Sequence, residues 1–267
     1  MSTAIGVLGP LTLSGVDVPA ARQQRLLLAA LVAALPDRVD PDRLMEGLWP
    51  DRRPGKPREA LQVLVARLRK TLAEAHADIV LGDDGYQLRV GPDAVDLLRF
   101  DRLCNEEHHL RSTELADRRR LLEEALDLWR GAPFGDLADE PLLVEVAEGL
   151  RLRREVAVGR LHEIRLELGE VDELLPELTS WARSHPLDEA AWSRLAVALH
   201  RAGRPNEALR TLHVYRVSVR DAAGVEPTSA LVELEARLLA DDAAVATNPP
   251  TRSGWFRAGR DRSPTGF

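Results

Sequence analysis

The sequence predicts a mainly α-helical protein: an N-terminal winged helix-turn-helix, with three helices and β-hairpins, followed by an all-α, tetratricopeptide-like helical-repeat domain. Two observations carry this prediction. Within the first 92 residues the patterns follow in the order strands, three helices, hairpin, and the remainder is helical with a period of 34 residues. With 267 residues and 45% hydrophobic content, the chain is long enough for two hydrophobic cores. We therefore expect domains at 1–92 and 93–245, and a disordered tail at 246–267 that is rich in Pro, Gly, Ser and Arg.

The chain begins with a pattern typical of short strands. Apolar and polar residues alternate over residues 11–18 around a Ser-Gly turn, which predicts a half-buried β-hairpin. Ile5, Val7 and Leu8 indicate a further strand just before it.

Two helices are predicted next. A helical period ends at Pro36, and Asp40 before Pro41 predicts the N-cap of a second, short helix that ends at Trp49-Pro50. The apolar positions of the two helices are Leu27, Ala30, Leu31 and Ala34 in the first, then Leu44, Met45 and Leu48 in the second.

A third helix is predicted from residue 57 to about residue 73. When successive residues are placed 100° apart, the apolar positions fall on one face. They are Leu61, Leu64, Val65, Leu68 and Leu72. The side that points away carries Glu59, Gln62, Val63, Ala66, Arg69 and Lys70, with Arg58 and Arg67 at its edges. A helix that packs wholly into a core does not normally expose arginines and a glutamine, so this side is a candidate binding surface.

The last element of this region is a predicted hairpin, whose strands at 79–81 and 86–90 flank an acidic turn at 82–85. This order of elements is typical of a winged helix-turn-helix, in which the third helix enters the DNA major groove and the hairpin wing rests on phosphates. Gln62 and Arg69 suit adenine and guanine edges. The side chains that suit phosphates are Arg52, Arg53, Lys56, Arg58, Arg67 and Lys70. Basic residues also occur on any solvated helix, so the DNA-binding hypothesis depends on the surrounding order of elements.

From about residue 96 the chain is helical and contains an internal repeat. A shift of 34 residues, the tetratricopeptide period, superposes similar residues. The pairs are Val158 with Trp192, Leu161 with Leu195, Gly169 with Gly203, Leu174 with Ala208, Leu178 with Leu212 and Trp181 with Tyr215. A looser unit ends at Trp129, and a final helix follows Pro227 and ends near Leu239. Such arrays present concave surfaces to peptides or helices of other proteins.

Charge is distributed unevenly along the chain. The overall net charge is −7, with +1 over residues 1–92, −11 over 93–245 and +3 over 246–267. This balance argues against a protein that coats nucleic acid nonspecifically, and it directs any polyanion to the N-terminal part.

The sequence shows no catalytic constellation. Cys104 is the single cysteine, so an intramolecular disulfide and a cysteine-rich zinc site are both excluded, and the thiol is expected to be half-buried and unreactive. His108 and His109 are adjacent helical positions and cannot bind a metal from one face. We expect no enzyme activity, cofactor or metal. With no signal peptide or membrane span in the sequence, we expect a cytoplasmic, nucleoid-associated protein.

The chain resembles the Streptomyces antibiotic regulatory protein (SARP) family over roughly residues 4–242. The signals in the first domain are Val7-Leu8-Gly9-Pro10-Leu11, Leu48-Trp49-Pro50, the run from Leu61 to Leu72, and Gly85-Tyr86-x-Leu88. Those in the second are Leu128-Trp129-Arg130-Gly131-Ala132-Pro133, His185-Pro186-Leu187-Asp188-Glu189, the run from Gly203 to Arg210, and Gly224-Val225-Glu226-Pro227. Each signal alone is weak, but their order is specific. The chain departs from the family pattern at Ala66 in the third helix and in the acidic wing.

The resemblance implies an OmpR-type winged helix joined to a bacterial transcriptional activation domain, in the small stand-alone form without an ATPase module. It also implies an activator of a secondary-metabolite (antibiotic) gene cluster that binds direct repeats in double-stranded promoter DNA as a head-to-tail pair and contacts RNA polymerase holoenzyme. The alternative is an adaptor whose helical repeat binds proteins and whose winged helix no longer binds DNA.

Overall fold

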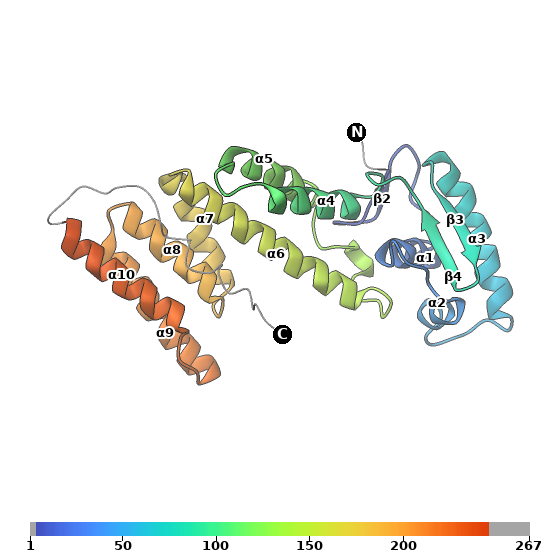
Figure 1. Ribbon diagram of the computed structural model, residues 1–267. Helices are drawn as coiled ribbons and strands as arrows, with labels where there is room; N and C mark the ends of the chain where they lie inside the picture. The colour runs from blue at the N-terminus through green and yellow to red at the C-terminus, as the bar shows by residue number, and fades with distance from the viewer. Residues whose placement is uncertain (1–3, 246–267) are drawn as a thin grey trace, which may run out of the picture. The chain divides into compact units, whose positions relative to one another are not determined.

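The computed structural model describes residues 4–245 (Figure 1), and the predicted tail at 246–267 lies outside the described residues. The described part is mainly helical, which confirms the predicted fold class. Its strands are β1 (Ile5–Gly6), β2 (Thr12–Leu13), β3 (Asp78–Gly82) and β4 (Gly85–Arg89). Its helices are α1 (Arg22–Ala33), α2 (Pro41–Leu48), α3 (Pro57–Glu74), α4 (Asp96–His109), α5 (Leu115–Leu126), the 3-10 helix η1 (Gly135–Leu137), α6 (Val144–Glu167), α7 (Val171–Ser184), α8 (Glu189–Arg201), α9 (Pro205–Ala223) and α10 (Ser229–Val245).

The described residues form two compact units, one that ends at Gly169 and one that begins at Glu170. The first unit holds the elements of the winged helix-turn-helix together with α4, α5 and α6, and the second holds α7 to α10. The predicted boundary between residues 92 and 93 lies inside the first unit. That residues 1–92 fold as an independent domain therefore stays a prediction.

Helices α1, α2 and α3 pack against one another, and the β3–β4 hairpin lies beside α3 (Figure 1). The predicted N-cap of α2 is confirmed, because the Asp40 carboxylate accepts hydrogen bonds from the backbone amides of Asp42 (2.7 Å) and Arg43 (3.2 Å). In the hairpin, Ile79 pairs with Leu88, and Val39 adds a short antiparallel bridge to Tyr86. The wing is therefore fixed from both sides of its second strand.

The hairpin predicted over residues 11–18 is wrong. β2 pairs instead with β1, in the register Ile5 to Leu13, and residues 16–18 form no strand. The segment before β2 supplies its partner, since the amide of Ser14 also donates to the carbonyl of Ala4 at 2.8 Å. β1 ends after Gly6, where the amides of Val7 and Leu8 donate to the Asp96 carboxylate at 2.8 and 3.0 Å. This side chain supplies the partners that a continued strand ladder would supply.

Within the first unit, α4 packs on α5 and α5 packs on α6. A fully buried carboxylate links the three helices: Glu107 on α4 is 2.7 Å from Arg118 on α5 and 2.6 Å from Arg160 on α6. A buried carboxylate is tolerated only when it is paired in this way, so the three side chains fix the relative positions of the helices.

In the second unit, α8 packs on both α7 and α9, and α10 packs on α8 and α9. Helices α7 and α9 begin 34 residues apart, as the predicted period requires. The equivalent positions Leu174 and Ala208, and likewise Leu178 and Leu212, are fully buried, so the repeat is a repeat of core positions. None of the helices over residues 4–245 has the combination of length and apolar composition that crossing a membrane requires.

Candidate nucleic-acid interface

Helix α3 presents one buried and one exposed side, as predicted. Its buried residues are Leu61, Val65, Leu68 and Leu72. The residues predicted to point away are all exposed: Arg58, Glu59, Gln62, Val63, Ala66, Arg67, Arg69 and Lys70. We call this set the outward face of α3. It is open within its unit and available to a ligand.

Three of the predicted phosphate-binding side chains form no ion pair or hydrogen bond with another described residue. They are Arg52 in the loop before α3, and Arg67 and Lys70 on the outward face. The amide of Gln62 is likewise without a partner among the described residues. These groups can meet a polyanion without first breaking an internal contact.

The other three phosphate candidates form surface ion pairs. Lys56 pairs with Glu59 at 2.7 Å, Arg53 with Glu46 at 3.4 Å, and Arg58 with Asp42 at 3.6 Å. All six side chains are more than half exposed. Exposed pairs of this kind contribute roughly 0–1 kcal/mol, so a phosphate can replace the carboxylate at little cost.

Arg69 has a second contact that its sequence position does not reveal. Its Nε donates a hydrogen bond to the backbone carbonyl of Ile79 in β3, at 2.7 Å, and also lies 3.8 Å from Asp78. The side chain is 43% exposed. Arg69 therefore fastens the wing to α3 through Nε, and its two terminal nitrogens form no hydrogen bond with another described residue.

The wing tip is acidic and its base carries an arginine. Asp83 and Asp84 are exposed at the turn between the two strands. The guanidinium of Arg38 lies directly against Gly82, where an added Cβ would fall 1.2 Å from its Nη1. Arg38 is a basic residue beside the wing that we did not predict, since only the fold brings the segment after α1 to the hairpin.

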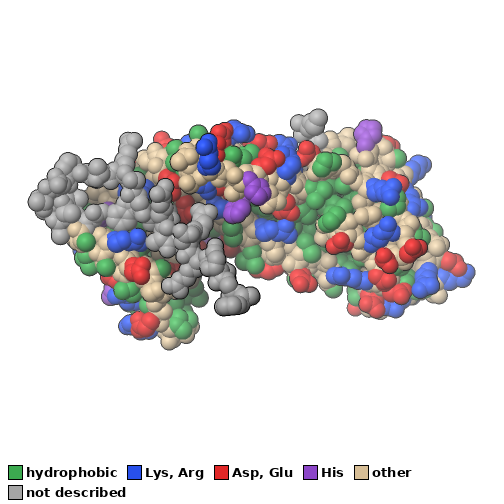
Figure 2. Space-filling view, viewed as in Figure 1, with side chains coloured by type: hydrophobic (Ala, Val, Ile, Leu, Met, Phe, Trp, Pro, Cys, Tyr) green, Lys and Arg blue, Asp and Glu red, His purple; other side chains and the backbone are tan. Residues whose placement is uncertain are grey.

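Gln87, on β4 of the wing, points toward the body of the domain. Its side-chain amide donates to the backbone carbonyl of Pro36 at 2.6 Å. Over the surface drawn in Figure 2, Lys and Arg side chains are interspersed with Asp and Glu side chains around these elements. The candidate interface is therefore a set of specific cations, not a uniformly basic field.

Two observations outside this interface concern metal binding and the single cysteine. Among residues 4–245, no group of three or more His, Cys, Asp or Glu side chains is arranged to hold a metal. Burial raises the pKa of the Cys104 thiol to about 11, so the thiol is protonated at neutral pH.

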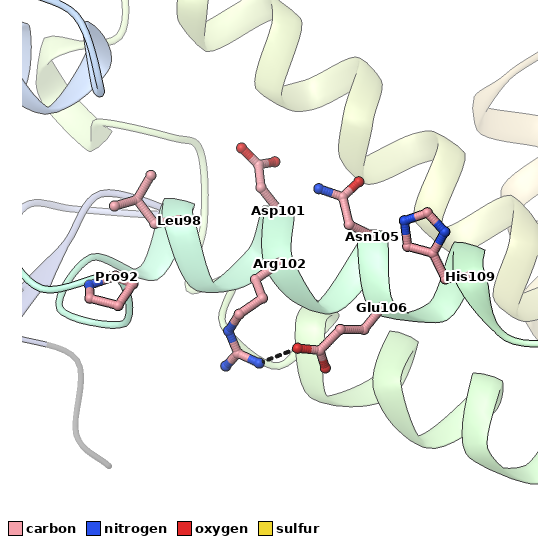
Figure 3. A pocket seen from close by; sticks show the side chains of 7 residues that line it. All are labelled: Pro92, Leu98, Asp101, Arg102, Asn105, Glu106 and His109. Carbon is pink, nitrogen blue, oxygen red and sulfur yellow. Dashed lines mark hydrogen bonds and ion pairs between the residues drawn. The ribbon is translucent and has the colours of Figure 1, made fainter.

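An open pocket of about 430 Å³ lies along α4, and Figure 3 shows that most of its lining side chains come from that helix. Its arginine, Arg102, is held between Asp93 (2.8 Å) and Glu106 (2.7 Å). These two hydrogen bonds raise the pKa of Arg102, with Glu106 the larger contributor. Arg102 and Glu106 thus satisfy each other, and the carboxylate of Asp101, which also lines the pocket, pairs with Arg153 at 2.9 Å.

The family model for the bacterial transcriptional activator domain matches residues 95–239. The regulatory protein DnrI of Streptomyces peucetius is 33% identical, over 92% of this chain and 95% of that protein. The regulatory protein AfsR of Streptomyces coelicolor is 34% identical, over 84% of this chain but only 22% of that protein.

Among solved structures, Mycobacterium tuberculosis EmbR in complex with a low-affinity phosphopeptide superposes with a TM-score of 0.82 and 28% sequence identity. The match covers 89% of this chain and 65% of the EmbR chain. The order of a winged helix-turn-helix followed by a helical activator domain is therefore shared with a solved structure along most of the chain.

Proposed function

We propose that this chain, which belongs to the SARP family of transcriptional regulators, activates transcription by binding promoter DNA sequence-specifically through α3. The observation that carries the proposal is the exposed outward face of α3, on which Gln62, Arg67 and Lys70 are free of internal partners. Unpaired cations bind phosphates and release counterions, and an amide on the same face can read a base edge.

In this proposal, base reading and phosphate binding belong to different side chains. Gln62 reads an adenine, and Arg69 reads a guanine with its terminal nitrogens while Nε holds the wing. Phosphates are bound by Arg52, Arg67 and Lys70 directly, and by Arg53, Lys56 and Arg58 after they exchange their carboxylate partners. The acidic wing tip does not bind phosphate. Arg38, whose guanidinium lies against Gly82 at the base of the wing, binds a phosphate in its place.

The partners proposed are direct repeats in promoter DNA, occupied by two copies of the chain head to tail, and RNA polymerase holoenzyme. The match of residues 95–239 to a transcriptional activator domain supports a role of this part in activation. Its strong negative charge suits a basic surface on a polymerase subunit. The similarity to DnrI, which extends over nearly the whole of both chains, favours a secondary-metabolite cluster as the target and the cytoplasmic nucleoid as the place of action.

The test is a footprint of the purified full chain on the upstream regions of neighbouring genes. The proposal expects protection of one or more regions that contain direct repeats. Gln62→Ala should weaken specific binding and relax the preference at one base position, at a cost of roughly 1–3 kcal/mol. Lys70→Ala should weaken binding to all sequences alike and lower the salt dependence of the binding constant.

The matched control is Arg210→Ala, which removes an exposed arginine from α9 in the second unit and should leave DNA affinity unchanged. If the full chain protects no region, or if neither Gln62→Ala nor Lys70→Ala alters affinity, DNA binding by α3 is refuted. The adaptor function then becomes the better explanation of the helical repeat.

A further inference from the structure

The outward face of α3 has an apolar side chain at its centre. Val63 is 49% exposed and is the one large apolar residue of α3 that is exposed. It lies opposite the buried row formed by Leu61, Val65, Leu68 and Leu72. It therefore contributes nothing to the core of the domain.

The surroundings of Val63 leave it accessible and suited to a nonpolar contact. Ala66, one turn along the helix, is also exposed and is too small to cover it. Glu59, one turn back, is the nearest acidic position on this face, and its carboxylate is held by the Lys56 ammonium at 2.7 and 3.0 Å. On the other flank stands Arg67, whose side chain has no partner among the described residues.

A valine at this position is costly for the fold and useful for a contact. Lys, Gln or Glu would favour an exposed helix position more strongly, since β-branched side chains lose rotamer freedom in a helix. The same stiffness means that Val63 loses little further entropy when a ligand covers it. Its two methyl groups stand on the face that the proposed function turns toward the major groove.

We infer that Val63 is a specificity-determining residue that packs against the 5-methyl group of a thymine. The methyl of thymine is the apolar group that the major groove presents, and it distinguishes a T·A pair from the other pairs. Val63 follows Gln62 directly, so the thymine lies close to the adenine that Gln62 reads. This inference rests on the proposed function and names part of the sequence that the DNA site must contain.

The experiment uses the fragment protected in the footprint and replaces each thymine in turn with deoxyuridine, which removes the methyl group and nothing else. With the full-length wild-type chain, one position in each repeat should lose affinity about fourfold, the value expected for one buried methyl-sized group. The Val63→Ala variant should bind more weakly than wild type to the natural site and equally well to thymine and deoxyuridine at that position.

Two controls separate this contact from others. Leu81→Ala removes another exposed apolar side chain of the same unit, 58% exposed on the wing, and should leave the deoxyuridine effect intact. The Gln62→Ala variant should also retain the loss of affinity on deoxyuridine substitution. Val63→Ala should unfold at a temperature no lower than wild type, because the side chain is outside the core and alanine favours a helix more than valine does.

The outcomes distinguish the inference from the function on which it rests. A footprint in which no thymine methyl matters, or in which the effect persists in Val63→Ala, overturns the role of Val63 and leaves DNA binding by α3 intact. The absence of any footprint removes both. An effect that is lost in Val63→Ala and kept in the two control variants establishes the contact.

Discussion

The buried carboxylate of Asp96, at the start of α4, accepts a hydrogen bond at 3.0 Å from the guanidinium of Arg130, in the loop after α5. Both residues also hold the N-terminal segment. The Asp96 carboxylate accepts hydrogen bonds from the amides of Val7 and Leu8. Arg130 donates from its backbone amide to the carbonyl of Leu8 (2.7 Å) and from Nη1 to the carbonyl of Pro10 (3.0 Å). The family signals at residues 7–11 and 128–133, far apart in the chain, are thus in direct contact.

The first prediction is that Asp96→Ala strongly destabilises the protein. The change leaves the backbone amides of Val7, Leu8 and Leu97 and a partly buried guanidinium without their acceptor, and each buried polar group left unsatisfied typically costs about 1–3 kcal/mol. The loss should appear as a lower urea midpoint for the first unit. The control is Asp101→Ala, on the same helix as Asp96, which breaks an exposed pair with Arg153 of α6 and should cost less than about 1 kcal/mol. Equal effects of the two changes would show that the Asp96 contact is not a structural anchor.

The second prediction concerns the boundary expected between residues 92 and 93. A fragment of residues 1–92 lacks Asp96 and Arg130, and also Phe134, which is fully buried in the same core. We expect the 1–169 fragment to unfold cooperatively by circular dichroism, and the 1–92 fragment to unfold at a much lower temperature or without a transition. If the two fragments melt alike, the winged helix is an independent domain with the boundary that the sequence predicts.

Local patterns predicted the parts of the fold that depend on local rules. The outward face of α3 was identified because apolar residues from Leu61 to Leu72 recur with the helical period, and the start of α2 because Asp40 precedes a proline. The N-terminal hairpin was predicted wrongly because β2 pairs with Ile5 and Gly6, which precede it in the chain, and not with residues 16–18. Alternation of apolar and polar residues carries no information about such a partner.

The candidate site shows the same limit. The exposure of Gln62 and Lys70 follows from helix periodicity, so it was predicted. The bond from Arg69 to the carbonyl of Ile79 and the approach of Arg38 to Gly82 depend on how the hairpin folds back, so they were not. Glu107 similarly reads as a surface residue of an amphipathic helix, although it is fully buried between two arginines from other helices.

The third prediction separates the two contacts of Arg69. In the DNA-free protein, Arg69→Ala should increase amide hydrogen exchange in β3, because the tie from Nε to the Ile79 carbonyl is lost. Gln62→Ala removes a side chain without such a tie and should leave exchange in β3 unchanged. If exchange in β3 is the same in Arg69→Ala and wild type, the wing is held in place by its strand pairing alone.

The fourth prediction concerns Cys104. Burial is the largest cause that raises its thiol pKa from an ordinary value of 9.0 to about 11. The neutral thiol is therefore favoured in the folded state, and this contribution to stability is complete below pH 9 and lost as the pH rises toward 11. Alkylation by iodoacetamide at pH 8 should be slow in the folded protein and fast in urea. Rapid alkylation of the folded protein at that pH would contradict a half-buried, protonated thiol.

The last prediction concerns the acidic wing tip. In a winged helix bound to DNA, the turn at Asp83 and Asp84 lies near the phosphate backbone, where each carboxylate is repelled. A charge pair separated by about 4 Å in water interacts by roughly 1 kcal/mol, less in salt, so the double change of Asp83 and Asp84 to asparagine should tighten DNA binding severalfold at low salt. The gain should be equal for specific and nonspecific fragments, because phosphates carry no sequence information. The double change of Asp117 and Asp127 to asparagine, at exposed positions in the first turn and at the C-cap of α5, makes the same change in charge away from the wing and serves as the control. If the double variant binds no better than this control, the wing does not approach the duplex, and binding depends on α3 and the loop before it.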